Sequence, residues 1–129
     1  MQNAIFVAAT PGTTWPLTYQ DVERHLEARF PDVRCRHKFA PVSRMEYLDF
    51  ELTLDDMTRH GSYFDRSHLI LRDGSPEFWA ATIVWFLGLL PAGAPAVAMV
   101  ESNPDTATVP PGAGPQDIQQ LLDTLLDAE

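Results

Sequence analysis

A cysteine and a histidine two residues apart are the first pair in this sequence whose types could do chemistry. A strand over residues 33–39 would place Cys35 and His37 on the same face, because side chains alternate along a strand. A thiolate beside an imidazole is the arrangement of a cysteine nucleophile. However, Val33 and Phe39 share that face and are typical of a core. We therefore expect Cys35 to be a small, unreactive apolar side chain.

A second group combines residue types that bind metals: His60, Asp65, His68 and Asp73. Their spacing matches no recognised ligand signature, and a single cysteine excludes a multi-cysteine metal site within one chain. The pair at 55–56 follows a strand pattern and indicates a turn rather than an acid–base couple. The sequence contains no P-loop, dinucleotide fingerprint or G-x-S-x-G motif. We predict no catalytic residue, no metal and no cofactor, and these observations favour a protein that is not an enzyme.

Length and composition limit the class of protein. The 129 residues are enough for one domain over 1–129, and 45% apolar with 21% charged residues is ordinary for a globular chain. A net charge of −9 argues against binding to nucleic acid. The longest apolar stretch, residues 78–90, is shorter than the ~20 residues that cross a bilayer. With no signal-peptide pattern at the start and one cysteine, we expect a cytoplasmic protein.

The charge is unevenly distributed along the chain. All nine basic residues lie between Arg24 and Arg72, a segment whose net charge is +1. From Asp73 to Glu129 there are eight acids and no base, so this part carries −8. A surface of one sign confers solubility, and it also steers association with a partner of opposite sign.

Hydrophobic periodicity predicts five strands and three helices. Strands are expected over 4–9, 33–39, 47–54, 68–72 and 96–100, and helices over 19–30, 76–90 and about 118–126. Thr18 with Asp21, and Ser75 before Pro76, are typical of helix starts. The order β-α-β-β-β-α-β-α predicts a two-layer α+β fold, with helices on one face of a mixed or mostly antiparallel sheet of about five strands. A ferredoxin-like core is one arrangement that this order allows.

Two neighbouring strands carry opposite charges on matching faces. Arg34, Arg36 and Lys38 alternate along the first, and Asp49 and Glu51 alternate along the second. When the strands pair antiparallel, the cationic row faces the acidic row. Such cross-strand pairs stabilise a sheet by ~0.2–1 kcal/mol each and help to fix its register. We therefore predict a β-hairpin here.

Two segments depart from the usual pattern. The helix over 76–90 has almost no polar side, although a helix on one face of a sheet normally keeps one. Either the C-terminal helix covers it, or it exposes an apolar patch for homodimerisation or for a partner. Residues 101–115 contain four prolines and two glycines, which predicts a long loop before the C-terminal helix. That loop acts as a spacer, or it passes the helix to a neighbouring chain.

Two functional hypotheses follow. The first is a small acidic protein that binds another protein, for example an inhibitor or immunity-type protein for a basic toxin or nuclease. Its expected partner-binding residues are Glu101, Asp105, Asp117, Asp123, Asp127, Trp79 and Trp85. The second is a homodimeric small-molecule-binding domain, or an enzyme of unknown substrate, with a pocket between sheet and helices. Its expected ligand-binding residues are Tyr47, Tyr63, His60 and His68.

Overall fold

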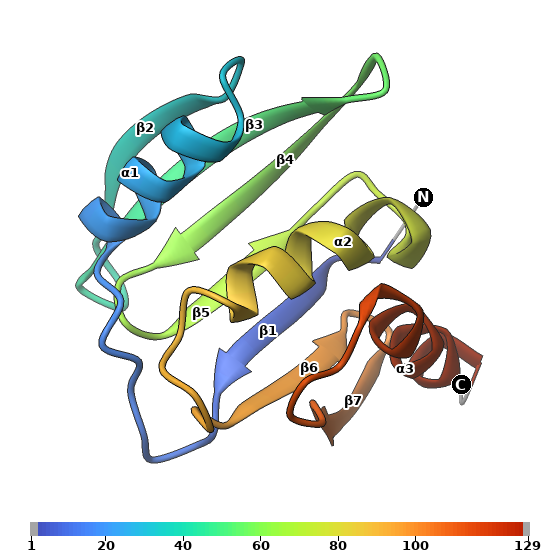
Figure 1. The fold of residues 1–129 in the computed structure, drawn as a ribbon. Coiled ribbons are helices and arrows are strands. Elements are labelled where there is room, and N and C mark those ends of the chain that lie inside the picture. Colours follow the sequence, from blue (N-terminus) through green and yellow to red (C-terminus); the bar gives the residue numbers. More distant parts are fainter. Residues whose placement is uncertain (1–2, 128–129) are drawn as a thin grey trace.

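The computed structural model describes residues 3–127, which form one antiparallel sheet of seven strands and three helices. The elements in chain order are β1 (Ile5–Ala9), α1 (Tyr19–Arg29), β2 (Arg34–Ala40), β3 (Met45–Leu54), β4 (Met57–Phe64), β5 (His68–Leu71), α2 (Pro76–Leu87), β6 (Ala96–Val100), β7 (Asn103–Thr108) and α3 (Pro115–Asp127). The strands are arranged β2-β3-β4-β5-β1-β6-β7. Figure 1 shows the three helices on the same side of the sheet. The chain is therefore α+β in two layers, as predicted.

The expected number of strands, about five, is wrong because β4 and β7 lack a clear apolar alternation. A two-residue turn joins β3 to β4, and both of its residues, Asp55 and Asp56, have positive φ (51° and 65°), as a type I′ hairpin turn requires. β7 lies inside the segment that was expected to be a loop. Among the described residues it pairs only with β6, and its Pro104 is tolerated because β7 is an edge strand.

The strand order also corrects the expected connectivity. β5 and β6 are joined through α2 and run parallel to each other with β1 between them, which is a split β-α-β arrangement. The strands β2 and β3 stand between α1 and β4, so the plain β-α-β-β-α-β order of a ferredoxin-like core is not reproduced. Every strand pair is antiparallel, so the sheet is not mixed in its pairing.

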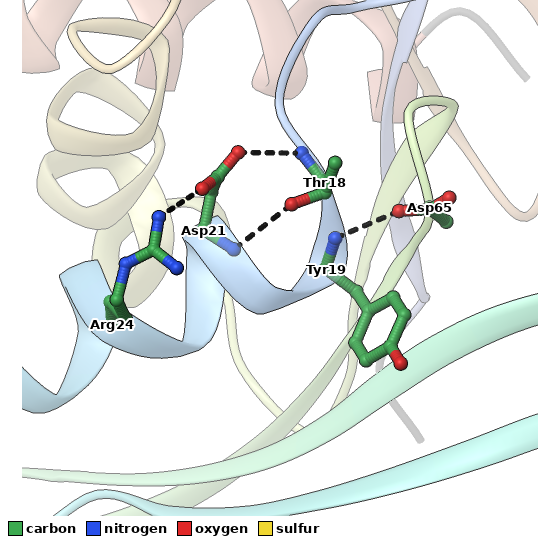
Figure 2. Close-up of polar contacts among 5 residues, drawn as sticks. All are labelled: Thr18, Tyr19, Asp21, Arg24 and Asp65. Carbon is green, nitrogen blue, oxygen red and sulfur yellow. Dashed lines mark hydrogen bonds and ion pairs between the residues drawn. The ribbon is translucent and has the colours of Figure 1, made fainter.

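Local hydrogen bonds define the start of α1 and attach it to the sheet (Figure 2). The side chain of Thr18 accepts a hydrogen bond from the backbone N–H of Asp21, and the carboxylate of Asp21 accepts one from the backbone N–H of Thr18, which is a capping box. The backbone N–H of Tyr19 donates to Asp65, which lies between β4 and β5, at 2.8 Å. The predicted helix start is confirmed, and Asp65 is occupied by this contact.

The core lies between the helices and one face of the sheet. Trp15, Tyr63 and Phe86 are buried together, with ring centroids of Trp15 at 6.4 Å from Tyr63 and 5.5 Å from Phe86. The indole N–H of Trp15 donates to the carbonyl of Pro95, so this buried polar group is satisfied. Trp15 belongs to the segment between β1 and α1, which therefore contributes to the core as well as connecting two elements.

The apolar helix α2 is covered by its own chain. It packs against α3, and its Trp85 meets Phe30 at the end of α1 edge-on, at 5.2 Å between ring centroids. Among residues 3–127, the large apolar side chains that are strongly exposed are Phe39, Val42 and Met57, none of which is in α2. α2 is therefore mostly covered except near its C-terminal end, where Val84 and Leu87 line a hollow, and it ends at Leu87 rather than at residue 90.

Candidate functional site

The sheet face opposite the helices is covered by no helix of the described chain, and we refer to it as the open face. Its residues alternate along each strand with the buried core residues. The register aligns them in rows across the sheet: Lys38, Tyr47, Phe64, His68, Ala8 and Val97; then Arg36, Asp49, Ser62, Ile70, Phe6 and Met99; then Arg34, Glu51 and His60. The β2–β4 half of this face is mainly charged, and the β5–β1–β6 half is mainly apolar.

The charged half contains a groove of about 440 Å³, which we call the charged groove. It is lined by Arg34, Arg36, Lys38, Asp49, Phe50, Glu51, His60, Gly61 and Arg72. The predicted hairpin is confirmed here, since Arg34 lies opposite Glu51 and Arg36 opposite Asp49. The lining has four cationic side chains and two carboxylates, which leaves a local surplus of positive charge in a protein whose net charge is −9.

A hydrogen-bonded network connects the two sides of the charged groove. The buried hydroxyl of Ser62 donates to Asp49 at 2.5 Å and accepts from a guanidinium N–H of Arg72 at 2.8 Å. The ammonium of Lys38 lies 3.0 Å from the other carboxylate oxygen of Asp49. Burial alone would raise the pKa of Asp49, but the hydrogen bonds from Ser62 and Lys38 outweigh it and hold the pKa below its usual value. The hydrogen bond to Ser62 holds the guanidinium group of Arg72, and the lowered pKa favours the charged form of Asp49.

His60 is one of the residues that line the charged groove. It is opposite Glu51 in the register, and its Nδ1 is 2.7 Å from a carboxylate oxygen of Asp73, just beyond β5. Both side chains are more than half exposed, so the pair contributes little to stability. It does orient the imidazole at the end of the groove where Arg72 lies.

The apolar half of the open face consists of Phe6, Ile70, Val97 and Met99, all half-buried. We refer to these four as the apolar patch. A stack of rings lies beside it: Tyr47 packs on Phe64 at 4.5 Å between ring centroids, and Phe64 packs on His68 at 4.6 Å. Burial lowers the pKa of His68, which favours its neutral form on this surface.

The expected ligand-binding residues are not all brought together. Tyr47, His60 and His68 lie on the open face, but Tyr63 is on the opposite face, fully buried, and its hydroxyl donates to the carbonyl of Leu17 at 2.7 Å. The space between sheet and helices, where a pocket was expected, is occupied by core side chains. A second hollow, of about 670 Å³, lies between the end of α2 and the segments around 91–96 and 108–113. Its lining is mainly apolar.

The expected partner-binding residues separate into two environments. Trp79 is fully buried, and its indole N–H donates to the carbonyl of Arg72, so it is not at the surface of the folded chain. Trp85 is half-buried against Phe30. The acids lie at the β7 and α3 end of the molecule: Glu101, Asp105, Asp117 and Asp127 are exposed, and Asp123 is half-buried.

Two of these acids already have local partners. The carboxylate of Glu101 accepts from the backbone N–H of Ala4 at 3.1 Å. The carboxylate of Asp117 accepts from the backbone N–H of Gly114 at 2.9 Å. Part of the negative charge at this end therefore stabilises the fold locally, and the rest faces solvent.

Cys35 and His37, the residues first considered for catalysis, do not form a thiolate–imidazole pair in the structure. Burial, together with the nearby Glu23 and Glu27, raises the pKa of Cys35 to about 11, which suppresses the thiolate. His37 pairs with Glu46 and stacks on Tyr19, with 4.5 Å between ring centroids. Within residues 3–127 no group of three or more His, Cys, Asp and Glu side chains could hold a metal ion. None of the three helices described here combines the length and apolar character that a membrane crossing requires.

The sequence analysis identified the charged rows of the hairpin but did not assign them to a site. Ser62 and Arg72 were missed, because β4 has no apolar alternation and was not predicted as a strand. A signal was present in the polar residues at every second position of β4, Thr58, His60 and Ser62, which continue the charged face of β3. No family model, curated protein or solved structure matches this chain, so its function is inferred from the geometry.

Proposed function

We propose that this protein acts without catalysis, by binding a partner protein through the open face of its sheet. The observation that supports this proposal is the position of the apolar patch, Phe6, Ile70, Val97 and Met99, on a face that no helix of the described chain covers. In a two-layer protein an apolar sheet face is normally buried against another layer. Here a partner would supply that layer.

The size of the open face suits a protein partner. Seven strands at ~4.8 Å spacing extend over roughly 29 Å, and five residues along a strand cover about 17 Å. The product, about 500 Å² in projection, is of the order of the ~800 Å² of accessible surface that each partner contributes to a standard interface. A stack of aromatic rings at the border, Tyr47 on Phe64, is typical of contact surfaces.

The charged groove indicates the chemistry of that partner. Its four cations exceed its two carboxylates, so the matching surface would carry carboxylates beside an apolar contact area. A second copy of this chain fits this description poorly, because its own open face has the same positive surplus. We therefore propose a different protein as the partner.

A basic partner is the second candidate, and the exposed acids at the β7 and α3 end favour it. Glu101, Asp105, Asp117 and Asp127 gather at the end of the sheet opposite β2. This version corresponds to an inhibitor or immunity-type protein for a basic toxin or nuclease. Its contact would be mainly electrostatic, and its association would weaken strongly as salt concentration rises.

Capture from a host extract with matched variants separates these candidates. Ile70→Asp places a charge at the centre of the apolar patch, and Val42→Asp places the same charge on a fully exposed apolar residue between β2 and β3. We expect a polypeptide that is retained by the wild type and by Val42→Asp and lost with Ile70→Asp. A thermal melt of each variant confirms that it is folded.

Other outcomes have definite meanings. Loss of the partner only when Glu101, Asp105 and Asp127 are neutralised would support the basic partner and contradict the open-face proposal. A native mass spectrum with a dimer that Ile70→Asp dissociates would replace the partner protein by a second copy of the chain. Retention of the same proteins by every variant would contradict both candidates.

A further inference from the structure

We infer that the charged groove is a binding site for a small molecule with two or more oxyanion groups, of the phosphate or carboxylate type. The proposed function uses this groove as well, for the carboxylates of a partner, but the inference can hold without that partner because its evidence is the charged half of the open face and not the apolar patch. The ligand class follows from three properties of the groove: its surplus of charge, the orientation of its donors and its dimensions.

The surplus of charge is concentrated in three guanidinium groups. Among the groove cations, only Lys38 forms an ion pair with a carboxylate of the described chain, at 3.0 Å from Asp49. Arg34, Arg36 and Arg72 make no ion pair within residues 3–127 at a distance of 4.0 Å or less. Guanidinium groups match the planar geometry of carboxylate and phosphate oxygens and bind them through two parallel hydrogen bonds.

One of these donors is held in place before any ligand binds. Arg72 donates to the buried hydroxyl of Ser62 at 2.8 Å, and this hydroxyl is itself held by Asp49. A guanidinium group has five N–H donors, so the bond to Ser62 leaves several for a ligand. Because part of the side-chain entropy of Arg72 is already lost in the free protein, less is lost on binding.

The dimensions of the groove suit a ligand with more than one anionic group. Arg34 and Arg36 belong to β2 and Arg72 follows β5, three strand spacings away, which is roughly 14 Å. This is the spacing of the backbones, and Arg72 reaches inward as far as Ser62 on β4, so a molecule with two oxyanion groups offers one group to each side. The volume of about 440 Å³ lies within the range of small-molecule sites.

The overall negative charge does not prevent this binding. Glu101, Asp105, Asp117 and Asp127 are near β7, which lies six strand spacings, or roughly 29 Å, from β2, while the exposed Asp73 beside the groove is paired with His60. The Debye length is ~8 Å at physiological ionic strength, so the field at the groove is determined mainly by the residues that line it.

Calorimetric titration of the full chain with inorganic pyrophosphate and with citrate, at constant ionic strength, tests the inference. We expect saturable binding of at least one of them, with inorganic phosphate at least tenfold weaker. Arg36→Gln and Arg72→Gln should each lower the affinity at least tenfold. Arg24→Gln, an exposed arginine on α1 paired with Asp21, is the matched control and should change it less than twofold.

Two further outcomes keep the test decisive. Arg36 is exposed on an edge strand, so its variant should remain folded even if Arg72→Gln is destabilised through Ser62. Binding that is absent for both probes, or that falls equally in Arg24→Gln, would overturn the inference. Met99→Asp alters the apolar patch on β6, two strand spacings from β5, and should still bind the anion, so failure of the partner proposal and failure of this one are separately visible.

Discussion

Replacement of Asp49 by asparagine should lower stability and raise anion affinity in the same molecule. The asparagine keeps the shape of the side chain but removes its charge. The buried Ser62 hydroxyl then loses a charged acceptor that is 2.5 Å away, and Lys38 loses its ion pair. At the same time the charged groove gains one unit of net positive charge.

The expected loss of stability is about 1–2 kcal/mol. A hydrogen bond to a charged group contributes about 1.5–3 kcal/mol, of which a neutral acceptor retains roughly half. The ion pair to Lys38 adds no more than about 1 kcal/mol, because both side chains are at least one third exposed. With an unfolding entropy of about 2.1 cal/mol/K per residue over the 129 residues, the melting temperature should fall by about 4–7 °C.

The pH dependence distinguishes this mechanism from general damage to the sheet. Burial alone would raise the pKa of Asp49, but hydrogen bonds from Ser62 and Lys38 hold it below its usual value. Such a carboxyl stabilises the fold above its unfolded pKa of about 3.9, and the stabilisation is lost as the pH falls through its folded pKa. The wild type and Asp49→Asn should therefore differ fully at pH 6–7, and the difference should shrink as the pH falls below about 4.

Urea unfolding at several pH values, followed by tryptophan fluorescence, measures this difference. Glu51→Gln is the control, because Glu51 forms no ion pair within the described chain and its loss should cost less than about 0.5 kcal/mol. A stability difference that is the same at pH 3 and pH 7 would refute the reasoning. So would an Asp49→Asn variant that binds pyrophosphate more weakly than the wild type.

Three further predictions concern the fold around the site. Gly61→Ala should destabilise by about 1–3 kcal/mol in urea unfolding, because a Cβ there would lie 2.4 Å from the buried ring of Phe50; an unchanged midpoint would contradict this. Asn103→Ala should lower the free energy of unfolding by about 1–3 kcal/mol, because it removes the buried amide N–H that donates to the carbonyl of Leu125. Hydrogen exchange should then become faster in β7 and α3 only, and faster exchange in other elements would count against this prediction. Cys35 should react with iodoacetamide at pH 7.5 at least roughly 100-fold more slowly than free cysteine, because its pKa of about 11 suppresses the thiolate; rapid modification of the folded chain would be incompatible with that environment.

The sequence predicted the elements with strong local signals. The capping residues Thr18 and Ser75 defined the starts of α1 and α2, and the opposite charges on β2 and β3 defined the hairpin and the pairing of its rows. These features depend on residues that are close in the sequence or alternate regularly. The side of the sheet covered by helices also followed from the element order.

The rest depended on long-range pairing. β4 was missed because its partners on both sides, β3 and β5, satisfy its backbone and tolerate polar residues on the open face. β7 was missed because a short edge strand with Pro104 resembles a loop in sequence. The charged groove could not be assembled without β4, since Ser62 and His60 connect Arg72 to the β2–β3 hairpin. Trp79 was expected at a contact surface, but it is buried. The sequence did not show this, because whether α2 is covered depends on where α3 packs.

The separation of charge along the sheet has a consequence for how the whole molecule behaves near charged material. Residues 24–72, which include β2 to β5, have a net charge of +1, while the segment 73–129, which ends in β7 and α3, carries −8, so the protein has an electric dipole along the hydrogen-bonding direction of its sheet. A charged surface would therefore select an orientation, not merely attract or repel the chain according to its pI of about 4.7. An anionic surface would meet the β2 end, and a cationic one would meet α3. Immobilisation through either end would leave the opposite end accessible, which can be tested on oppositely charged chips.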